Sequence, residues 1–277
     1  MPMEPTLKKS TEVNDQAATG EIAGPVIRGT SKIWIARTIS IVVVVGGWEI
    51  VGRRVSPVFL SYPSAIVKAA FAMTRSGELL SALATSLQTL VIGFVGASAI
   101  GIALGLLIGR YKIVDAATDW LINALYAMPM VAIIPLVILW FGLGEAAKLF
   151  IVGITSVFPV LINTAAGVRN VSRALIDVST AFAANERQVF TKIILPAAVP
   201  YMMTGLRLGI GRAIIGMVVA EFFTAITGLG AVIVKYGNQY DTASMFVPIL
   251  VLMLLGVVLT QGVRRLEEVF APWRDVD

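Results

Sequence analysis

The stretch LLSALATSLQTLVIGFVGASAIGIALGLLIG occupies residues 79–109 and contains no Asp, Glu, Lys or Arg. A helix needs about 20 predominantly apolar residues to cross the hydrocarbon core of a bilayer, so this run is long enough to span a membrane. Glu78 and Arg110 bracket the run and mark its two ends. We therefore predict a transmembrane helix here and place it at 83–109.

The same pattern recurs along the chain. Three further uncharged runs predict membrane spans at 119–142, 147–168 and 243–263. Two weaker spans are expected at 33–52, where charged side chains near the ends can snorkel to the interface, and at 199–226, which contains three charged residues. The sequence thus predicts an all-α, polytopic membrane protein with about six transmembrane helices.

Composition agrees with this class and excludes several functions. The chain is 57% hydrophobic and 14% charged, with a mean hydropathy of +0.85, well outside the usual balance of soluble proteins. Cysteine and histidine are absent, which excludes disulfides, Cys/His zinc sites and Ser-His-Asp triads. No GxxxxGK[ST] motif occurs, so the chain has no P-loop for ATP. We expect no catalytic site, metal or cofactor, and a membrane-embedded hydrolase or transferase is disfavoured.

The distribution of Lys and Arg predicts the topology. Most of them fall in segments that lie on one side if both termini are cytoplasmic, although Arg53 and Arg54 fall on the other side. The net charge of +5 then reflects orientation in the lipid bilayer, and no nucleic-acid surface is expected. We expect a disordered cytoplasmic tail at 1–30, a transmembrane region at 31–268 and a second cytoplasmic tail at 269–277.

Small residues recur every four positions in the expected span 83–109. Each step of four turns a helix by about 400°, so these residues form one slowly drifting groove that admits another helix backbone. The sequence alone leaves two partners open, another helix of the same chain or a second subunit. The stripe consists of Gly93, Ala97, Gly101, Gly105 and Gly109.

Four residues are candidates for lining a pathway through the membrane. Pro129 and Pro135 lie inside the expected span 119–142, where each removes a backbone donor, and broken helices at membrane depth often line cavities. Arg212 and Glu221 lie inside the fifth span. A charge there costs about 2.5–3.5 kcal/mol, so each should face protein, water or the interface. The alternatives are tolerated prolines and charges that only hold helices together.

The more polar segment 169–197 separates the expected spans 147–168 and 199–226. Apolar residues recur at helical spacing on both sides of the polar break ANER (184–187), which predicts two short amphipathic helices. The donor-free imide of Pro196 suits the first turn of a new helix, so we expect the fifth span to begin there. The alternative is a solvated connecting loop.

This segment resembles the cytoplasmic signature of ATP-binding-cassette importer permeases, written E-A-A, three residues, Gly, nine residues, I-x-L-P. Asp177, Val178 and Ser179 occupy the E-A-A positions, Ala183 stands at the glycine, and 193–196 reads IILP. Three further stretches resemble the nitrate, sulfonate, taurine and bicarbonate branch of these permeases. They are PMVAIIPLVILWFGLG (129–144), VFPVLINTAAGVRNV (157–171) and the segment from Leu195 to Gly230. The resemblance covers about 60–263.

The resemblance implies a permease of the bacterial inner membrane that works with ABC ATPase subunits, an external solute-binding protein and a second permease copy, forming a homodimer. Its solutes would be small anions or zwitterions of the aliphatic sulfonate, taurine or nitrate class. The 174–196 loop would transmit force from the ATPase. The implied coupling residues are Asp177, Val178, Ser179, Phe182, Ala183, Glu186, Arg187, Leu195 and Pro196.

Alternatives to these assignments stay open. Phe182 can instead pack on its sister helix, and Glu186 and Arg187 can be ordinary solvated charges. A different class of function is a secondary transporter driven by an ion gradient. Such carriers tend to show internal repeats, and no convincing duplication is visible in this sequence.

Overall fold

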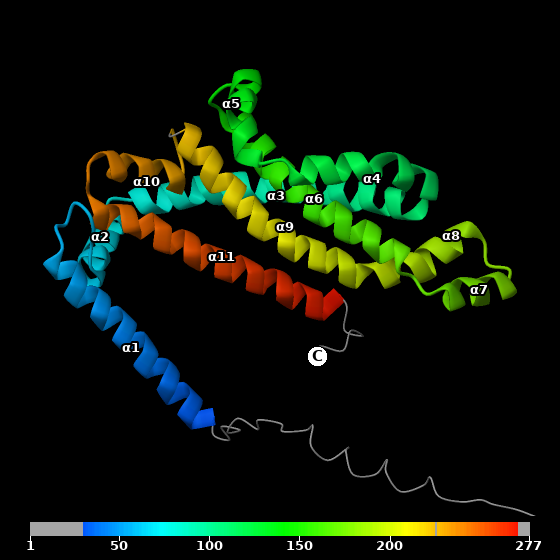
Figure 1. The fold of residues 1–277 in the computed structure, drawn as a ribbon, viewed down its shortest axis with the longest axis horizontal. Helices are drawn as coiled ribbons and strands as arrows, with labels where there is room; N and C mark the ends of the chain where they lie inside the picture. The colour runs from blue at the N-terminus through cyan, green and yellow to red at the C-terminus, as the bar shows by residue number, and fades with distance from the viewer. Residues whose placement is uncertain (1–29, 225, 271–277) are drawn as a thin grey trace, which may run out of the picture. The chain divides into compact units, whose positions relative to one another are not determined.

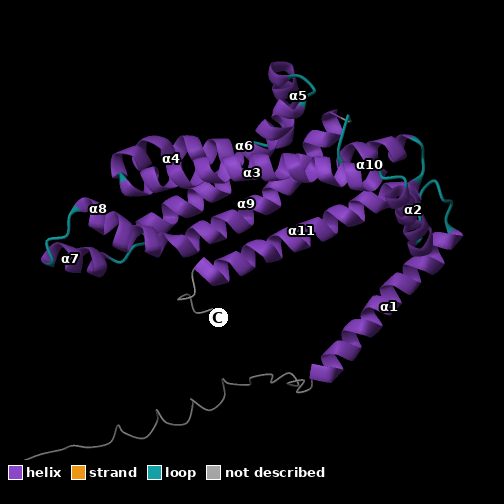
Figure 2. Cartoon of the chain, turned by 180° about the vertical axis from the view of Figure 1, so that it is seen from behind, coloured by secondary structure: helices purple, strands orange, loops and turns teal. Residues whose placement is uncertain are grey.

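The computed structural model describes residues 30–224 and 226–270, and within them every regular element is a helix (Figures 1 and 2). The all-α prediction is confirmed. The expected tails lie outside the described residues, apart from the helical positions Thr30, Val269 and Phe270. The chain divides into two units, 1–48 and 49–277, and the sites described below belong to the second.

The elements follow one another with short connections. In chain order they are α1 (Thr30–Arg54), α2 (Pro63–Arg75), α3 (Glu78–Arg110), α4 (Lys112–Ala127), α5 (Met130–Phe141), α6 (Glu145–Arg169), α7 (Arg173–Ala181), α8 (Glu186–Val189), a π-helical turn (Phe190–Ile194), α9 (Leu195–Thr224), α10 (Leu229–Asn238) and α11 (Thr242–Phe270).

Four of these helices are long and apolar enough to cross a membrane by themselves, namely α1, α3, α6 and α11. Two bent pairs, α4 with α5 and the α8–α9 rod with α10, pass the same test as pairs. The described residues therefore supply four spans, or six if each bent pair is one span. The expectation of about six spans corresponds to the upper figure.

The expected continuous span 119–142 is broken in the structure. Helices α4 and α5 meet at an angle of 93° around Met128 and Pro129. Met128 is extended, with φ −65° and ψ 132°, because the ring of a following proline disfavours the α conformation. Pro129 cannot donate a backbone hydrogen bond, so it caps α5 instead of continuing α4. Pro135 lies inside α5 and does not interrupt it.

Helix α6 is the centre of the packed unit. In the most apolar stretch of α6, 50% of the residues are buried, compared with 33% in that of α3 and 17% in that of α11. Leu90 of α3, Val152 of α6 and Met217 of α9 pack together in one core cluster. Figure 1 shows α3 and α9 running along α6, with α11 on the outer side of α9.

The small-residue stripe of α3 packs on α6 of the same chain. A Cβ added at Gly105 would lie 2.6 Å from Thr164 Cβ and 2.7 Å from the Leu161 carbonyl oxygen. A Cβ added at Gly93 or Gly109 would likewise collide with α6, at Val152 and Val168 respectively. Gly101 and the buried Ala97 lie on the same face of α3. Of the two partners left open by the sequence, the structure shows the intramolecular one.

Candidate functional sites

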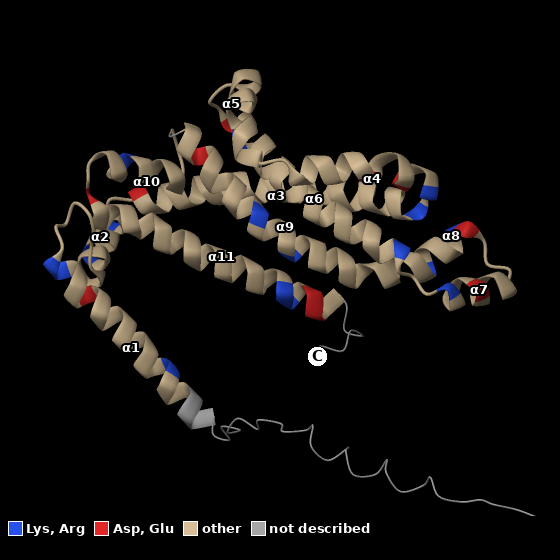
Figure 3. Cartoon of the chain, viewed as in Figure 1, with Lys and Arg blue, Asp and Glu red and all other residues tan. Residues whose placement is uncertain are grey.

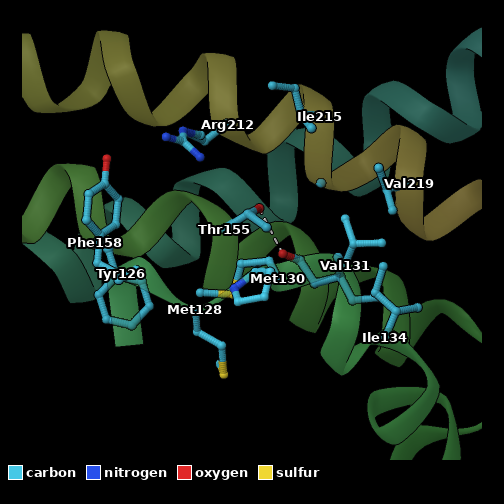
Figure 4. A pocket seen from close by; sticks show the side chains of 14 residues that line it. Tyr126, Met128, Met130, Val131, Ile134, Thr155, Phe158, Arg212, Ile215 and Val219 are labelled. Carbon is cyan, nitrogen blue, oxygen red and sulfur yellow. Dashed lines mark hydrogen bonds between the residues drawn. The ribbon is translucent and has the colours of Figure 1, made fainter. Parts of the chain in front are cut away.

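The first candidate site is a cavity of about 380 Å³ at the α4–α5 break. Residues of α4, the break and α5 form one side of the cavity, and residues of α6 and α9 form the other (Figure 4). Most of the lining is apolar, as is usual for a small-molecule site with a few polar groups. Its polar side chains are Tyr126 of α4, Thr155 of α6 and Arg212 of α9.

Arg212 is the cation of this cavity. It lies about 26 Å from Leu195 and about 18 Å from Thr224 by helical rise, close to the middle of the span. Its guanidinium carbon is 5.7 Å from the centroid of the Tyr126 ring, and among the described residues no carboxylate lies within salt-bridge distance of it. The side chain is exposed in the single chain. A cation at this depth requires water, a solute or another subunit beside it.

Thr155 and Tyr126 are the other two polar side chains that line the cavity beside Arg212. Thr155 donates its hydroxyl proton to the carbonyl oxygen of Ile151 at 2.9 Å, so its oxygen remains able to accept (Figure 4). Tyr126 packs against Phe158 with ring centroids 6.3 Å apart. Gly216 faces Thr155, and a Cβ there would collide with the Thr155 hydroxyl. The arrangement can receive an anionic group at Arg212 and an apolar body beside it.

The structure separates the four pathway candidates. Pro129 and Arg212 both line the cavity, while Pro135 and Glu221 do not. Tyr126, Thr155 and Phe158 were not predicted from the sequence, because they come from separate helices, α4 and α6, and share no motif. The available signal was the proline break itself, since Tyr126 precedes it by three residues.

Glu221 is fully buried and holds the start of α10. Its Oε1 accepts a hydrogen bond from Ser86 Oγ at 2.6 Å, and its Oε2 accepts one from the Gly230 amide at 2.7 Å. Ser86 Oγ in turn accepts the Leu229 amide at 2.8 Å. The first amides of a helix have no intrahelical acceptor, so these contacts satisfy the Leu229 and Gly230 amides at the start of α10.

A buried lysine lies close to this contact. Lys148 is 2% exposed and donates to Thr227 Oγ1 at 2.6 Å and to Glu145 Oε2 at 3.3 Å. Glu145 also accepts from the hydroxyl of Thr89. These contacts tie α3 and α6 to the α9–α10 connection. Buried charges are tolerated only when paired and hydrogen-bonded, and this pairing meets that condition.

The second candidate site is the segment from α7 to α8. Two backbone hydrogen bonds end α7: Ala184 N–H to the Ser179 carbonyl at 3.0 Å and Ala183 N–H to the Thr180 carbonyl at 2.9 Å. This is a Schellman motif, and Ala183 adopts the left-handed conformation that the motif requires, with φ +50°. Alanine thus takes a conformation that costs glycine nothing and costs other residues about 1–2 kcal/mol.

The second helix of this segment differs from the expectation. It starts at a capping box formed by Asn185 and Gln188, but it does not stop before Pro196. A π-turn at Phe190–Ile194 leads directly into α9, with the Leu195 amide bonded to the Phe190 carbonyl five residues back. The wider turn makes room for the proline ring, which would clash in a regular α-helix. Helix α9 thus begins at Leu195 with Pro196 in its first turn, as expected, but no break separates it from α8, and the two helices form one continuous rod.

The outward face of α7 is apolar. Leu175, Val178 and Phe182 are 49%, 54% and 83% exposed, and their spacing of three and four places them on one face. Phe182 is therefore not buried against α8, which removes that alternative. Ser179 is buried and Ile176 packs inward against the α6–α9 junction. Asp177, Glu186 and Arg187 are exposed, while Leu195 and Pro196 lie half-buried in the rod.

Charges gather at this end of the unit. Figure 3 shows Lys and Arg in blue around α7, α8 and the start of α4, whereas the middle of α3 and α11 carries none. The fold and the two sites together define a polytopic membrane protein with a cavity at a helix break and an exposed apolar face on α7.

Comparison with known proteins identifies the family. Residues 98–270 match the family described as "Binding-protein-dependent transport system inner membrane component". The chain is similar to a putative ABC transporter permease of Methanocaldococcus jannaschii (34% identity; 82% of this chain, 87% of the relative). It is also similar to the putative aliphatic sulfonates transport permease SsuC of Bacillus subtilis (32% identity; 87% and 88%).

A solved structure supports the fold. An amino acid ABC transporter chain, described as crystallised with histidines, aligns with a TM-score of 0.53 at 18% identity, covering 74% of this chain and 98% of that chain. The present chain belongs to the inner membrane component family of binding-protein-dependent transport systems. It is a multi-pass permease of the inner membrane in an ATP-driven importer, with a separate ATPase subunit and a binding protein as partners. The gradient-driven carrier is thereby set aside.

Proposed function

We propose that this permease imports small organic anions of the aliphatic sulfonate class through the cavity at the α4–α5 break, with Arg212 receiving the anionic group. The observation that carries the proposal is the position of Arg212, exposed at mid-span and without a carboxylate partner among the described residues. A sulfonate supplies the missing negative charge, and its alkyl part fits the apolar walls. The similarity to SsuC, named for aliphatic sulfonates, supports the same class.

The test compares uptake by the complete transporter in proteoliposomes. We expect Arg212→Gln to reduce uptake of an alkanesulfonate by about tenfold or more, since a charge-assisted contact is worth about 1.5–3 kcal/mol. Arg207→Gln is the matched control because Arg207 lies on the same helix and pairs with Glu267 at 3.5 Å, outside the cavity. Equal sulfonate uptake by the Arg212 variant and the wild type would refute the assignment.

The exposed face of α7 is proposed as the ATPase contact, with both chain termini in the cytoplasm. Leu175, Val178 and Phe182 supply an apolar anchor of the kind that dominates protein interfaces, with the charges of the coupling segment around it. The buried Ser179 and the turn at Ala183 would shape this segment from within.

Substitutions on opposite faces of α7 test this contact. Phe182→Asp should abolish co-purification of the ATPase while membrane insertion is kept. Thr180→Asp adds the same charge at an exposed position roughly 160° away on the helix, so it should leave the complex intact. Retention of the ATPase by the Phe182 variant would place the contact elsewhere.

A homodimer is proposed because the cavity has an open side. Arg212 and Ile215 are exposed there in the single chain, and a second copy would supply the missing wall. The chain has no cysteine, so one introduced cysteine is unique. Ile215→Cys should cross-link two copies with a short bifunctional reagent, whereas Ile100→Cys on the exposed face of α3 should not. Absence of the Ile215 cross-link would argue against this dimer.

A further inference from the structure

A groove separate from the central cavity lies between the end of α3 and α8. Its volume is about 480 Å³, within the range of small-molecule sites. One wall is the last part of α3, and the other is α8 with the π-turn that follows it. None of the pathway candidates lines this groove, and the exposed apolar face of α7 is not part of it.

The groove is apolar at one end and cationic at the other. Ala103, Leu106 and Leu107 line it along α3, and Arg110 follows on the same face one turn later. Arg187 contributes a second guanidinium from α8. This order of groups, an apolar wall followed by two arginines that line the same groove, matches an acyl chain that ends in a phosphate.

The position of the groove in the membrane fits such an occupant. Helix α3 has 33 residues and is about 48 Å long by helical rise, which exceeds the hydrocarbon core of about 30 Å. Arg110, its last residue, therefore reaches the headgroup region. Leu107, which lines the groove, and Leu104 beside it are 46% and 42% exposed, so apolar surface on α3 is open to a lipid chain.

The arginines are available for an added anion. Arg110 approaches the carboxylate of Glu186 only to 4.0 Å, and the Glu186 side chain is 90% exposed, so this pair is weak. The groove thus holds two guanidinium groups against one loosely engaged carboxylate. Its net positive charge favours an anionic ligand over a zwitterionic one.

We propose that this groove binds an anionic phospholipid of the cytoplasmic leaflet, whose phosphate lies between Arg110 and Arg187. The proposal rests on the orientation given under the proposed function, with α7 and α8 in the cytoplasm. The lipid would link α3, which belongs to the packed core, to α8, which belongs to the coupling segment. It would thereby stiffen the connection through which movement of the ATPase reaches the cavity.

The experiment measures lipid retention by the complete transporter. The complex is purified from bilayers of phosphatidylcholine doped with phosphatidylglycerol of the same chains, and retained lipid is counted by native mass spectrometry. At about 1 kcal/mol per arginine near the surface, Arg110→Gln or Arg187→Gln should lower phosphatidylglycerol retention about fivefold, and the double variant about 30-fold. Arg173→Gln, exposed at the start of α7 outside the groove, should change nothing.

Two further arms guard against misfolding and against a plain phosphate site. Glu186→Gln removes the competing carboxylate and should raise retention, a gain that a damaged protein cannot imitate. Excess inorganic phosphate should not displace the lipid, because phosphate has no apolar part for the α3 wall. Wild-type retention by the double variant, displacement by phosphate, or no selective retention by the complete complex would each overturn the proposal. Continued co-purification of the ATPase with Arg110→Gln alone, which lies at the end of α3 and outside the coupling segment, separates this outcome from failure of the coupling proposal.

Discussion

Replacing Gly105 with alanine tests how closely α3 and α6 pack. The added Cβ would lie 2.6 Å from Thr164 Cβ, whereas carbon atoms in contact normally stay about 3.5–4.0 Å apart. The two helices must therefore separate locally by about 1 Å. Overpacking of this kind costs about 1–3 kcal/mol.

Gly96→Ala is the matched control for this substitution. Gly96 lies on the same helix, and nothing lies within 4 Å of the Cβ that alanine would add there. Both substitutions gain the same helix propensity, about 1 kcal/mol, so their difference reports packing alone. At about 2–4 °C per kcal/mol, Gly105→Ala should unfold roughly 2–12 °C below Gly96→Ala.

The assay is the apparent thermal midpoint of the purified permease, measured by size-exclusion recovery at one detergent and protein concentration. The relevant quantity is the difference between the two variants, because detergent shifts both midpoints together. Equal midpoints would mean that α3 and α6 do not approach as closely as described. They would refute the role of the small-residue stripe in packing α3 against α6.

Three further substitutions probe the buried polar groups and the turn of the coupling segment. Glu221→Ala leaves the Gly230 amide and a buried hydroxyl without their acceptor and opens a cavity, so the midpoint should fall by an amount equivalent to about 3–5 kcal/mol in the same thermal assay. Ala183→Gly should change stability by less than about 1 kcal/mol, since relief of the left-handed strain offsets the added chain entropy, while Ala183→Val should reduce ATPase co-purification. Lys148→Met removes the buried bond to Thr227, and limited proteolysis should then cut the α9–α10 connection faster than in the wild type.

The sequence by itself predicts that the protein is an all-α membrane protein, because membrane spans follow from local hydropathy. The uncharged run at 79–109 predicts α3 without reference to any other residue, since the backbone groups of a helix are bonded within it except at its two ends. The spacing of the EAA-like segment likewise places the turn at Ala183, where the structure has its left-handed residue. A bend in the span 119–142 was expected at Pro129 or Pro135, because each lacks a backbone donor, but the sequence did not tell which of the two prolines breaks the helix.

Other features depend on which helices meet. The partner of the glycine stripe, the burial of Glu221 beside Ser86, and the pairing of Lys148 with Thr227 join residues far apart in the chain, and no local pattern encodes them. Pro196 lies in the first turn of α9 as expected, but the sequence did not predict the π-turn that joins α9 to α8 without a break. Local hydropathy and backbone chemistry thus determined the elements, while tertiary packing decided which polar groups are buried and which line a cavity, because burial depends on neighbours brought together only by the fold.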